Sequence, residues 1–329
     1  MRGLNVIAFG LQDGSGFWRI RITFGELNKH GHNCILSPHE INEEEMKGKD
    51  VIVLKNVTDK IGIGKALEMK ETQGSRIIMD LDDDITVRDD NPMLKEHKIQ
   101  DSKFIFTKTA QFVDAITVTT EYLATNIRKL TDKPVIVAPN SFDPSYHLVP
   151  NTKHLGPLRI IWGGSQTHSV DLQMIAPVIK KIREMYGVKF VAVGDPRIRE
   201  WWGEETEVRP SLDVEYYMSG LASLAGDIGI CPLVDDEFNR NKSPIKSMEF
   251  GLLGMPVVAS PTVYKYIPTV DIAETEEEWI EKLSNLIKYP DVRKRKAEVH
   301  RNWVLYNTNI EKTYKIWEDL YYGHSCSNK

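Results

Sequence analysis

Two lysines flank the start of an expected helix in the stretch 241–260, NKSPIKSMEFGLLGMPVVAS. Ser243 is a favourable N-cap residue, and Pro244 fits the first helical position, where a missing N–H costs nothing. The other N–H groups of a first turn attract anions, and Lys242 and Lys246 add positive charge beside them. The types and spacing of these residues predict a binding site for a phosphate or a diphosphate.

Glu249 lies one turn beyond Lys246, on the same face of the expected helix. A rise of ~1.5 Å per residue places Glu249 roughly 7 Å along the axis from Pro244, a separation that suits a ribose attached to a diphosphate. Gly254 ends the helix before the apolar strand VVA. The alternative is a well-capped, solvent-facing helix with an ordinary Lys–Glu pair.

Four aspartates end an apolar strand in the stretch 79–85, MDLDDDI. Carboxylates this close repel one another, which raises the pKa of at least one of them unless cations or donor hydroxyls offset the charge. Three roles remain open: ligands of a divalent metal, a group that orients or deprotonates an acceptor hydroxyl, or an acidic first turn of a helix. The candidates are Asp80, Asp82, Asp83 and Asp84.

Glycines mark two further turns that follow expected strands. Gly163 and Gly164 end the strand LRIIWGG and precede polar residues and a helix. Gly14 and Gly16 give a flexible turn, with Arg19 just behind them. Neither stretch has the GxxxxGK[ST] or GxGxxG pattern, so each also fits an ordinary connection between a strand and a helix.

The 329-residue chain has a formal net charge of -5, which argues against a surface built mainly to coat nucleic acid or anionic membrane. Cys34, Cys231 and Cys326 form no CxxC pair, so neither a disulfide framework nor a thiolate metal site is expected. A reducing cytoplasm is the simplest location. The first residues read as a strand instead of a signal peptide, and no apolar run approaches the ~20 residues that span a bilayer. Integral membrane contact is therefore not expected.

Strand-like and helix-like segments alternate through most of the chain, which is the pattern of parallel sheets covered by helices. Turn formers dominate 139–157 and predict a linker between two doubly wound halves, with a ligand in the crevice between them. The stretch from 276 onward reads as helical. We expect domains at 1–150 and 151–305, and a C-terminal helix at 306–329 that packs back on the first domain.

The helix and strand of 241–260 resemble the C-terminal-domain signature of the family-four retaining glycosyltransferases, which have the GT-B fold. In that family the helix N-terminus receives the diphosphate of a nucleotide sugar, and a glutamate of the helix binds the ribose hydroxyls. Glu249 matches the second glutamate of the family's Glu-x7-Glu pattern, and GMPVVAS matches the strand. Asn241 stands where the first glutamate is expected. An acid at 235–237 replaces it only if the loop geometry differs.

Two other stretches resemble parts of the same family. The Gly163–Gly164 turn looks like the first loop of the donor domain, where an arginine and a lysine often neutralise the diphosphate; Ser165 and His168 stand there in this sequence. The loop of Gly14, Gly16 and Arg19 resembles the glycine-rich loop that faces the donor phosphates, and VAPNSFD at 137–143 resembles the hinge turn after the N-terminal domain. The phosphate contacts then shift to the basic residues Arg240, Lys242 and Lys246.

The resemblance implies an α/β protein of the GT-B class, with two doubly wound Rossmann-like domains facing each other across a cleft. It further implies transfer of a hexose or pentose from a nucleotide-diphosphate sugar, such as a UDP-sugar, to an acceptor hydroxyl with retention of configuration. The acceptor is a glycan, a protein or a modified DNA base, as in bacterial and phage-encoded members. No tightly bound cofactor is implied, and acceptor binding ranks above a metal for the aspartates. The implied catalytic residues are Asp80, Asp82, Asp83 and Lys242, and the implied donor-binding residues are Gly14, Gly16, Arg19, Gly163, Gly164, Ser165, Arg240, Asn241, Lys242, Ser243, Lys246 and Glu249.

Two alternatives remain open from the sequence. A GT-B nucleotide-sugar epimerase or hydrolase would turn over the donor without an acceptor. A non-catalytic protein that only binds a nucleotide sugar is compatible with the missing first glutamate and the missing Arg/Lys pair.

Overall fold

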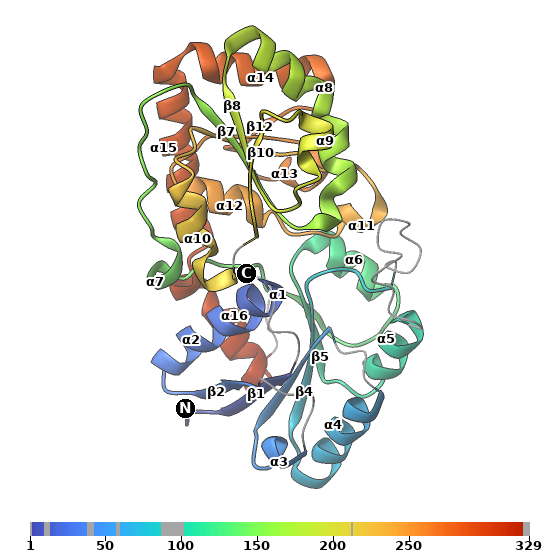
Figure 1. The fold of residues 1–329 in the computed structure, drawn as a ribbon. Coiled ribbons are helices and arrows are strands. Elements are labelled where there is room, and N and C mark those ends of the chain that lie inside the picture. The colour runs from blue at the N-terminus through green and yellow to red at the C-terminus, as the bar shows by residue number, and fades with distance from the viewer. Residues whose placement is uncertain are drawn as a thin grey trace. The chain divides into compact units, whose positions relative to one another are not determined.

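The computed structural model describes residues 2–9, 14–37, 43–56, 60–86, 102–211 and 213–324. The chain divides into two compact units, which Figure 1 shows. The first unit comprises Met1–Asp143, Arg240–Ser243 and Thr308–Lys329. The second unit comprises Pro144–Asn239 and Pro244–Asn307.

The first unit is built on a six-stranded parallel sheet in the order β2-β1-β3-β4-β5-β6. Its inner strands are nearly continuous apolar runs, which is typical of parallel strands covered on both faces. The strands are β1 (Asn5–Phe9), β2 (Asn33–Leu36), β3 (Val51–Lys55), β4 (Arg76–Leu81), β5 (Ala115–Val118) and β6 (Val135–Val137). The helices are α1 (Gly14–Gly16), a π-helical turn (Phe17–Arg21), α2 (Ile22–Lys29), α3 (Glu43–Met46), α4 (Lys60–Gln73), α5 (Ser102–Ala110), α6 (Glu121–Arg128) and α16 (Ile310–Tyr322).

The second unit contains another six-stranded parallel sheet, in the order β12-β11-β10-β7-β8-β9. Its strands are β7 (Arg159–Gly163), β8 (Lys189–Val193), β9 (Glu207–Arg209), β10 (Ile228–Cys231), β11 (Val257–Ala259) and β12 (Asp271–Ile272). Its helices are α7 (Pro144–His147), a 3-10 turn (Gln166–His168), α8 (Ser169–Tyr186), α9 (Ile198–Trp202), α10 (Val214–Ser223), α12 (Ile245–Leu252), α13 (Pro261–Tyr264), α14 (Glu276–Lys288) and α15 (Pro290–Asn307), and α11 (Glu237–Arg240) crosses the boundary to the first unit.

Helices α8 and α14 share one core with the second sheet. Leu172 of α8 and Leu283 of α14 are buried against Ile160 and Trp162, which project from the same face of β7. Buried side chains recur along α8 with helical spacing, so one stripe of the helix faces the sheet. This packing fixes the start of α8 beside the end of β7.

The expected α/β alternation and the doubly wound class are confirmed. Three short strands, β2, β9 and β12, were not predicted, and the expected linker 139–157 contains the helix α7. The flexible turn predicted at Gly14 and Gly16 is wrong for these two residues. They form the helical turn α1, which continues into the π-helical turn and α2.

The C-terminal helix α16 packs against α2 within the first unit. Ser141 and Thr313 exchange a hydrogen bond of 2.7 Å between their hydroxyls, and the backbone of Phe142 pairs with that of Asn309. Helix α16 also contacts Arg19, whose guanidinium lies 4.8 Å from the ring centroid of Trp317. No helix in the described part of the chain is long and apolar enough to cross a membrane.

Candidate functional site

The order of the second sheet reverses between β7 and β10, which pair with each other. Ligands of doubly wound sheets bind beyond the carboxyl ends of the strands at such a switch point. Gly163 and Gly164 lie at the end of β7, and Cys231 ends β10. The helix α12, which carries Lys246 and Glu249, packs against β10. The switch point is therefore the candidate site of the second unit.

Lys246 reaches over the glycine turn at the end of β7. A Cβ atom on Gly164 would lie 3.0 Å from Lys246 Cε and 2.6 Å from the ring of Trp162. The ammonium Nζ lies 6.0 Å from the centroid of that ring, within the range of a cation–π contact. Glycine at 164 thus lets the lysine approach the turn, which a larger residue would block.

A carboxylate and a histidine hold the lysine from the side of α8. Lys246 Nζ donates to His168 Nε2 at 3.0 Å, and His168 Nδ1 lies 2.6 Å from Asp171 Oδ2. The other carboxylate oxygen of Asp171 accepts the backbone N–H of Val234 at 2.7 Å. From the sequence, His168 was identified only as standing where the resembled family often has a basic residue, and Asp171 was not predicted. The available signal was an acid three residues after a histidine in the first turn of a helix.

Glu249 is buried in the same part of the second unit, with 5% of its surface exposed. Burial raises its pKa to about 7, although the Lys246 cation acts in the opposite direction. Burial, and to a lesser extent the charge of Glu249, also raises the pKa of Tyr217 on α10. The Tyr217 hydroxyl would lie 2.4 Å from a Cβ atom on Gly163, so this glycine is needed for the close approach of α10. The predicted solvent-facing alternative for α12 is therefore wrong at Glu249.

Helix α12 begins one residue later than expected. Pro244 occupies the N-cap position and makes no side-chain cap, and Ile245 is the first helical residue. Ser243 is not the N-cap: its hydroxyl accepts a hydrogen bond of 2.9 Å from Asn140 Nδ2. The predicted stop is confirmed, since Gly254 has φ +72 and Met255 N–H donates to Phe250 O at 2.9 Å.

The segment Arg240–Ser243 belongs to the first unit. Asn241 is fully buried, and its amide oxygen accepts a hydrogen bond of 3.1 Å from Asn126. The Asn241 side chain therefore contacts α6 within the first unit. Lys242 and Arg240 are partly buried in this segment. The structure thus assigns Lys242 and Lys246, expected to flank one helix start, to different units.

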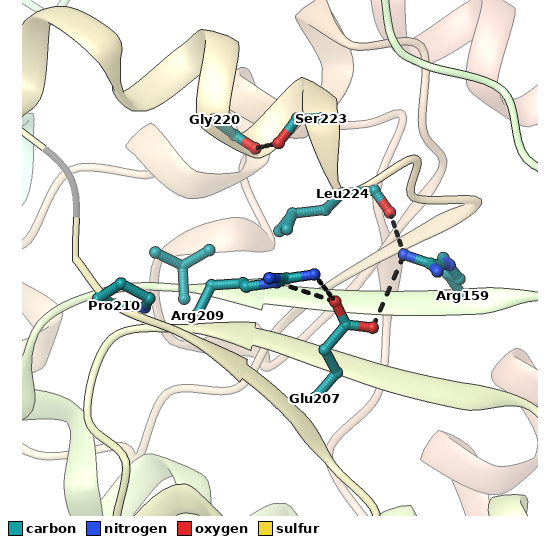
Figure 2. A pocket seen from close by; sticks show the side chains of 8 residues that line it. Arg159, Glu207, Arg209, Pro210, Gly220, Ser223 and Leu224 are labelled. Carbon is teal, nitrogen blue, oxygen red and sulfur yellow. Dashed lines mark hydrogen bonds and ion pairs between the residues drawn. The ribbon is translucent and has the colours of Figure 1, made fainter.

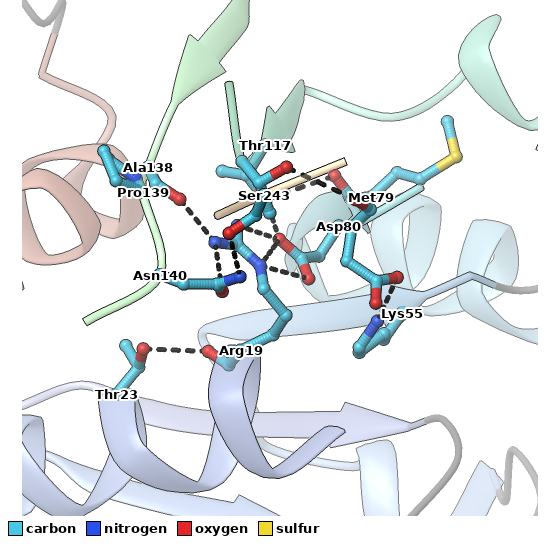
Figure 3. A network of polar contacts seen from close by, with 12 residues as sticks. Arg19, Thr23, Lys55, Met79, Asp80, Thr117, Ala138, Pro139, Asn140 and Ser243 are labelled. Carbon is cyan, nitrogen blue, oxygen red and sulfur yellow. Dashed lines mark hydrogen bonds and ion pairs between the residues drawn. The ribbon is translucent and has the colours of Figure 1, made fainter. Parts of the chain in front are cut away.

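Arg19 and Asp80 form a buried ion pair in the first unit (Figure 3). Arg19 is 1% exposed and Asp80 is fully buried. The guanidinium donates to Asp80 from Nη2 at 2.7 Å and from Nε at 3.2 Å, and it also donates to the Ala138 carbonyl. Thr117 Oγ1 donates to Asp80 at 2.7 Å. Both charges are satisfied inside the protein, so Arg19 is a structural residue here instead of the phosphate ligand that the sequence predicted.

The remaining aspartates after β4 also have individual partners. Asp82 accepts hydrogen bonds from Lys55 Nζ at 2.8 Å and from Asn56 Nδ2 at 2.6 Å. Burial by itself raises the pKa of Asp82, but the Lys55 cation and hydrogen bonds from Lys55, Asn56 and Ser15 hold it well below its usual range. Asp84 accepts from the backbone and the hydroxyl of Thr86. The mutual repulsion expected for the cluster is therefore offset by cations at Asp80 and Asp82 and by hydrogen-bond donors at Asp84.

No group of three or more His, Cys, Asp or Glu side chains in the described ranges is arranged to hold a metal ion. A cavity of about 300 Å³ lies between β9 and α10 (Figure 2). Arg209 donates to Glu207 at 2.6 Å, and Arg159 lies 3.9 Å from the same carboxylate. Because Glu207 already offsets part of their charge, these arginines are weaker candidates for a diphosphate than Lys246.

No protein-family model matches the chain, and a search of curated proteins found no match. Among solved structures, the chain is similar to a sucrose-phosphate synthase from Thermosynechococcus elongatus, with a TM-score of 0.70 and 12% identity over 97% of this chain and 98% of that chain. It is also similar to a glycosyltransferase from Rickettsia africae ESF-5, with a TM-score of 0.71 and 12% identity over 98% and 99%. A putative UDP-N-acetylglucosamine 2-epimerase from Listeria monocytogenes gives a TM-score of 0.52 and 12% identity over 91% of each chain. These likenesses show the GT-B fold, with two Rossmann-like domains.

Proposed function

We propose that this protein is a glycosyltransferase that moves a sugar from a nucleotide-diphosphate sugar to an acceptor hydroxyl. The observation that carries the proposal is the position of Lys246, which lies over the glycine turn of β7 at the switch point of the second sheet. Two of the similar GT-B structures are enzymes named for glycosyl transfer or sugar-phosphate synthesis. The fold and the lysine support the same class of reaction.

In this proposal the donor binds at α12. The first N–H groups of the helix and Lys246 hold the diphosphate, and glycine at position 164 lets Lys246 lie over the end of β7. Glu249 accepts hydrogen bonds from the ribose hydroxyls, and its ionised form is the stronger acceptor. Lys246 and the helix dipole then stabilise the charge that develops on the leaving diphosphate. We also propose a catalytic role for Lys242, and retention of configuration as the stereochemical course.

The aspartates after β4 are the proposed acceptor site. Asp80 drops out of the candidate set because it is fully buried against Arg19. Asp82 keeps 17% of its side chain exposed, and Asp83 is half-buried, so these two remain to bind an acceptor hydroxyl. The low pKa of Asp82 makes it a weak base, so its proposed role is to orient the acceptor. A glycan, a protein or a modified phage DNA base, receiving a hexose or a pentose, fits this proposal.

The deciding experiment is a calorimetric titration with UDP-, GDP-, ADP- and TDP-sugars, followed by assays for released nucleoside diphosphate with and without acceptors. Acceptor-dependent release supports the proposal. Turnover of the donor alone would instead identify an epimerase or hydrolase, and one similar structure is named as a putative epimerase. Binding without any turnover would identify a non-catalytic binding protein.

Lys246→Ala is expected to weaken nucleoside diphosphate binding by roughly 1.5 to 3 kcal/mol, because it removes a charge-assisted hydrogen bond. Titration calorimetry at constant ionic strength measures this loss. Lys180→Ala is the matched control, since Lys180 is an exposed lysine of α8 in the same unit and should bind nucleotide like the wild type. Equal affinities of the two variants would contradict the proposed diphosphate site.

Activity is expected to survive a chelator. Lys55 already provides a cation to Asp82, so the proposed chemistry does not call for a divalent ion at the end of β4. The measurement is release of nucleoside diphosphate after dialysis against EDTA, with and without added Mg²⁺ or Mn²⁺. Loss of release in EDTA and its recovery with a divalent ion would place a metal in the reaction.

A further inference from the structure

His168 lies between a carboxylate and an ammonium group. An ammonium has only donors, so His168 Nε2 accepts from Lys246 at 3.0 Å, and Nδ1 donates its proton to Asp171 at 2.6 Å. The imidazole is therefore neutral in this arrangement, and its tautomer is fixed by Asp171. Asp171 is itself held by the N–H of Val234, and both Asp171 and His168 are buried. The pair is thus a rigid support for Lys246.

A bound diphosphate would change the partners of this histidine. Its oxygens are stronger acceptors for the ammonium than a neutral imidazole, because the hydrogen bond then joins two opposite charges. When Lys246 turns to the phosphate, Nε2 loses its donor and faces an anion. A proton on Nε2 would then be stabilised by the diphosphate on one side and by Asp171 on the other.

We propose that binding of a nucleoside diphosphate at this site is coupled to uptake of one proton from solvent by His168, which then donates Nε2–H to the phosphate. This inference rests on the proposed function. In this inference His168 is a second cation beside the diphosphate, and it is charged only while the diphosphate is bound. It takes the place of the arginine or lysine that this loop lacks. Asp171 is the positioning residue that keeps the ring in place.

The charged and titratable groups near His168 support its protonation when the diphosphate binds. Asp171 on α8 favours the imidazolium, and Lys246 on α12 opposes it until the lysine turns away. Trp162 on β7 lies edge-on, with its centroid 6.0 Å from that of His168, and is uncharged. Glu249 interacts with Lys246, and Tyr264 on α13 interacts with Asp171. Among these groups, Asp171 is the one whose negative charge stays in contact with the ring after Lys246 has moved.

The test is titration calorimetry of UDP and GDP into the full chain at pH 7, in buffers with different enthalpies of ionisation. The wild type is expected to take up more protons per bound nucleotide than His168→Gln, by up to about one. Proton exchange by the phosphates or by Glu249 occurs in both proteins and cancels in this difference. The ratio of wild-type to variant affinity is expected to fall by up to about tenfold between pH 7 and pH 8.

His154→Gln is the matched control, because His154 pairs with Asp227 at 2.9 Å at the amino ends of β7 and β10, whereas Lys246 lies over the carboxyl end of β7. It should show wild-type proton uptake. A second measurement needs no variant: imidazole ¹⁵N spectra of the wild type, in which one ring should change from the neutral to the protonated pattern on adding UDP.

Nucleotide binding with equal proton uptake in the wild type and His168→Gln, or with unchanged imidazole spectra, would overturn this inference and leave the proposed function intact. Failure of both nucleotides to bind, together with failure of the other nucleotide sugars, would overturn the inference and the proposed function alike.

Discussion

Arg19→Ala is expected to lower the free energy of unfolding by about 3 to 5 kcal/mol, because it leaves a fully buried carboxylate without its cation. Asp80 would keep only the hydroxyl of Thr117 among its observed side-chain partners. The variant would also lose the contact of the guanidinium with Trp317 and its hydrogen bond to Asn140. Urea unfolding at pH 7, followed by tryptophan fluorescence, measures the change.

Arg21→Ala is the control for this prediction. Arg21 lies in the same π-helical turn but is exposed, so its loss should change the free energy of unfolding by no more than about 0.5 kcal/mol. A stable Arg19→Ala variant that has lost nucleotide affinity would restore Arg19 as a donor ligand, as the sequence predicted. A destabilised variant that still binds nucleotide confirms the structural role.

The sequence predicted those elements whose signals are local. The end of helix α12 at Gly254 could be predicted because the left-handed φ of +72 there depends on one residue and its neighbours. Strands β3 and β4 could also be predicted, because a run of apolar residues is a local signal. Strands β9 and β12 have three and two residues, too few to show any periodicity, and only pairing with β8 and β11 defines them.

The candidate site was only partly predictable, because several of its contacts join distant parts of the chain. Lys246 and Glu249 were found together since they lie on one helix face. The pair of Arg19 and Asp80 spans 61 positions, and nothing in either local sequence indicates the other. Each residue alone looked like a ligand-binding group, whereas together they neutralise each other. The same limit applies to Lys246 and His168, which lie 78 positions apart.

Glu249→Gln is expected to become more stable relative to the wild type as the pH rises. Burial raises the pKa of Glu249 from 4.5 to about 7, so between these values the folded protein holds a proton that the unfolded chain has released. The contribution of this proton to the free energy of unfolding is therefore fully present below pH 4.5 and is lost as the pH rises through 7. Glutamine cannot ionise, so the variant escapes this loss. Between pH 5 and pH 8 the stability of the variant should gain roughly 2 to 3 kcal/mol on that of the wild type.

The measurement is the difference in free energy of unfolding between the two proteins at pH 5, 6, 7 and 8, because titrations common to both cancel in that difference. A constant difference would mean that Glu249 is ionised in the folded protein at pH 5, and its burial would then not govern its charge. UDP gives a second outcome. If the ribose hydroxyls of UDP donate to Glu249, they stabilise its carboxylate in the wild type. Saturating UDP should therefore reduce the gain in stability of the variant over the wild type at pH 8, and 2′-deoxy-UDP should reduce it less.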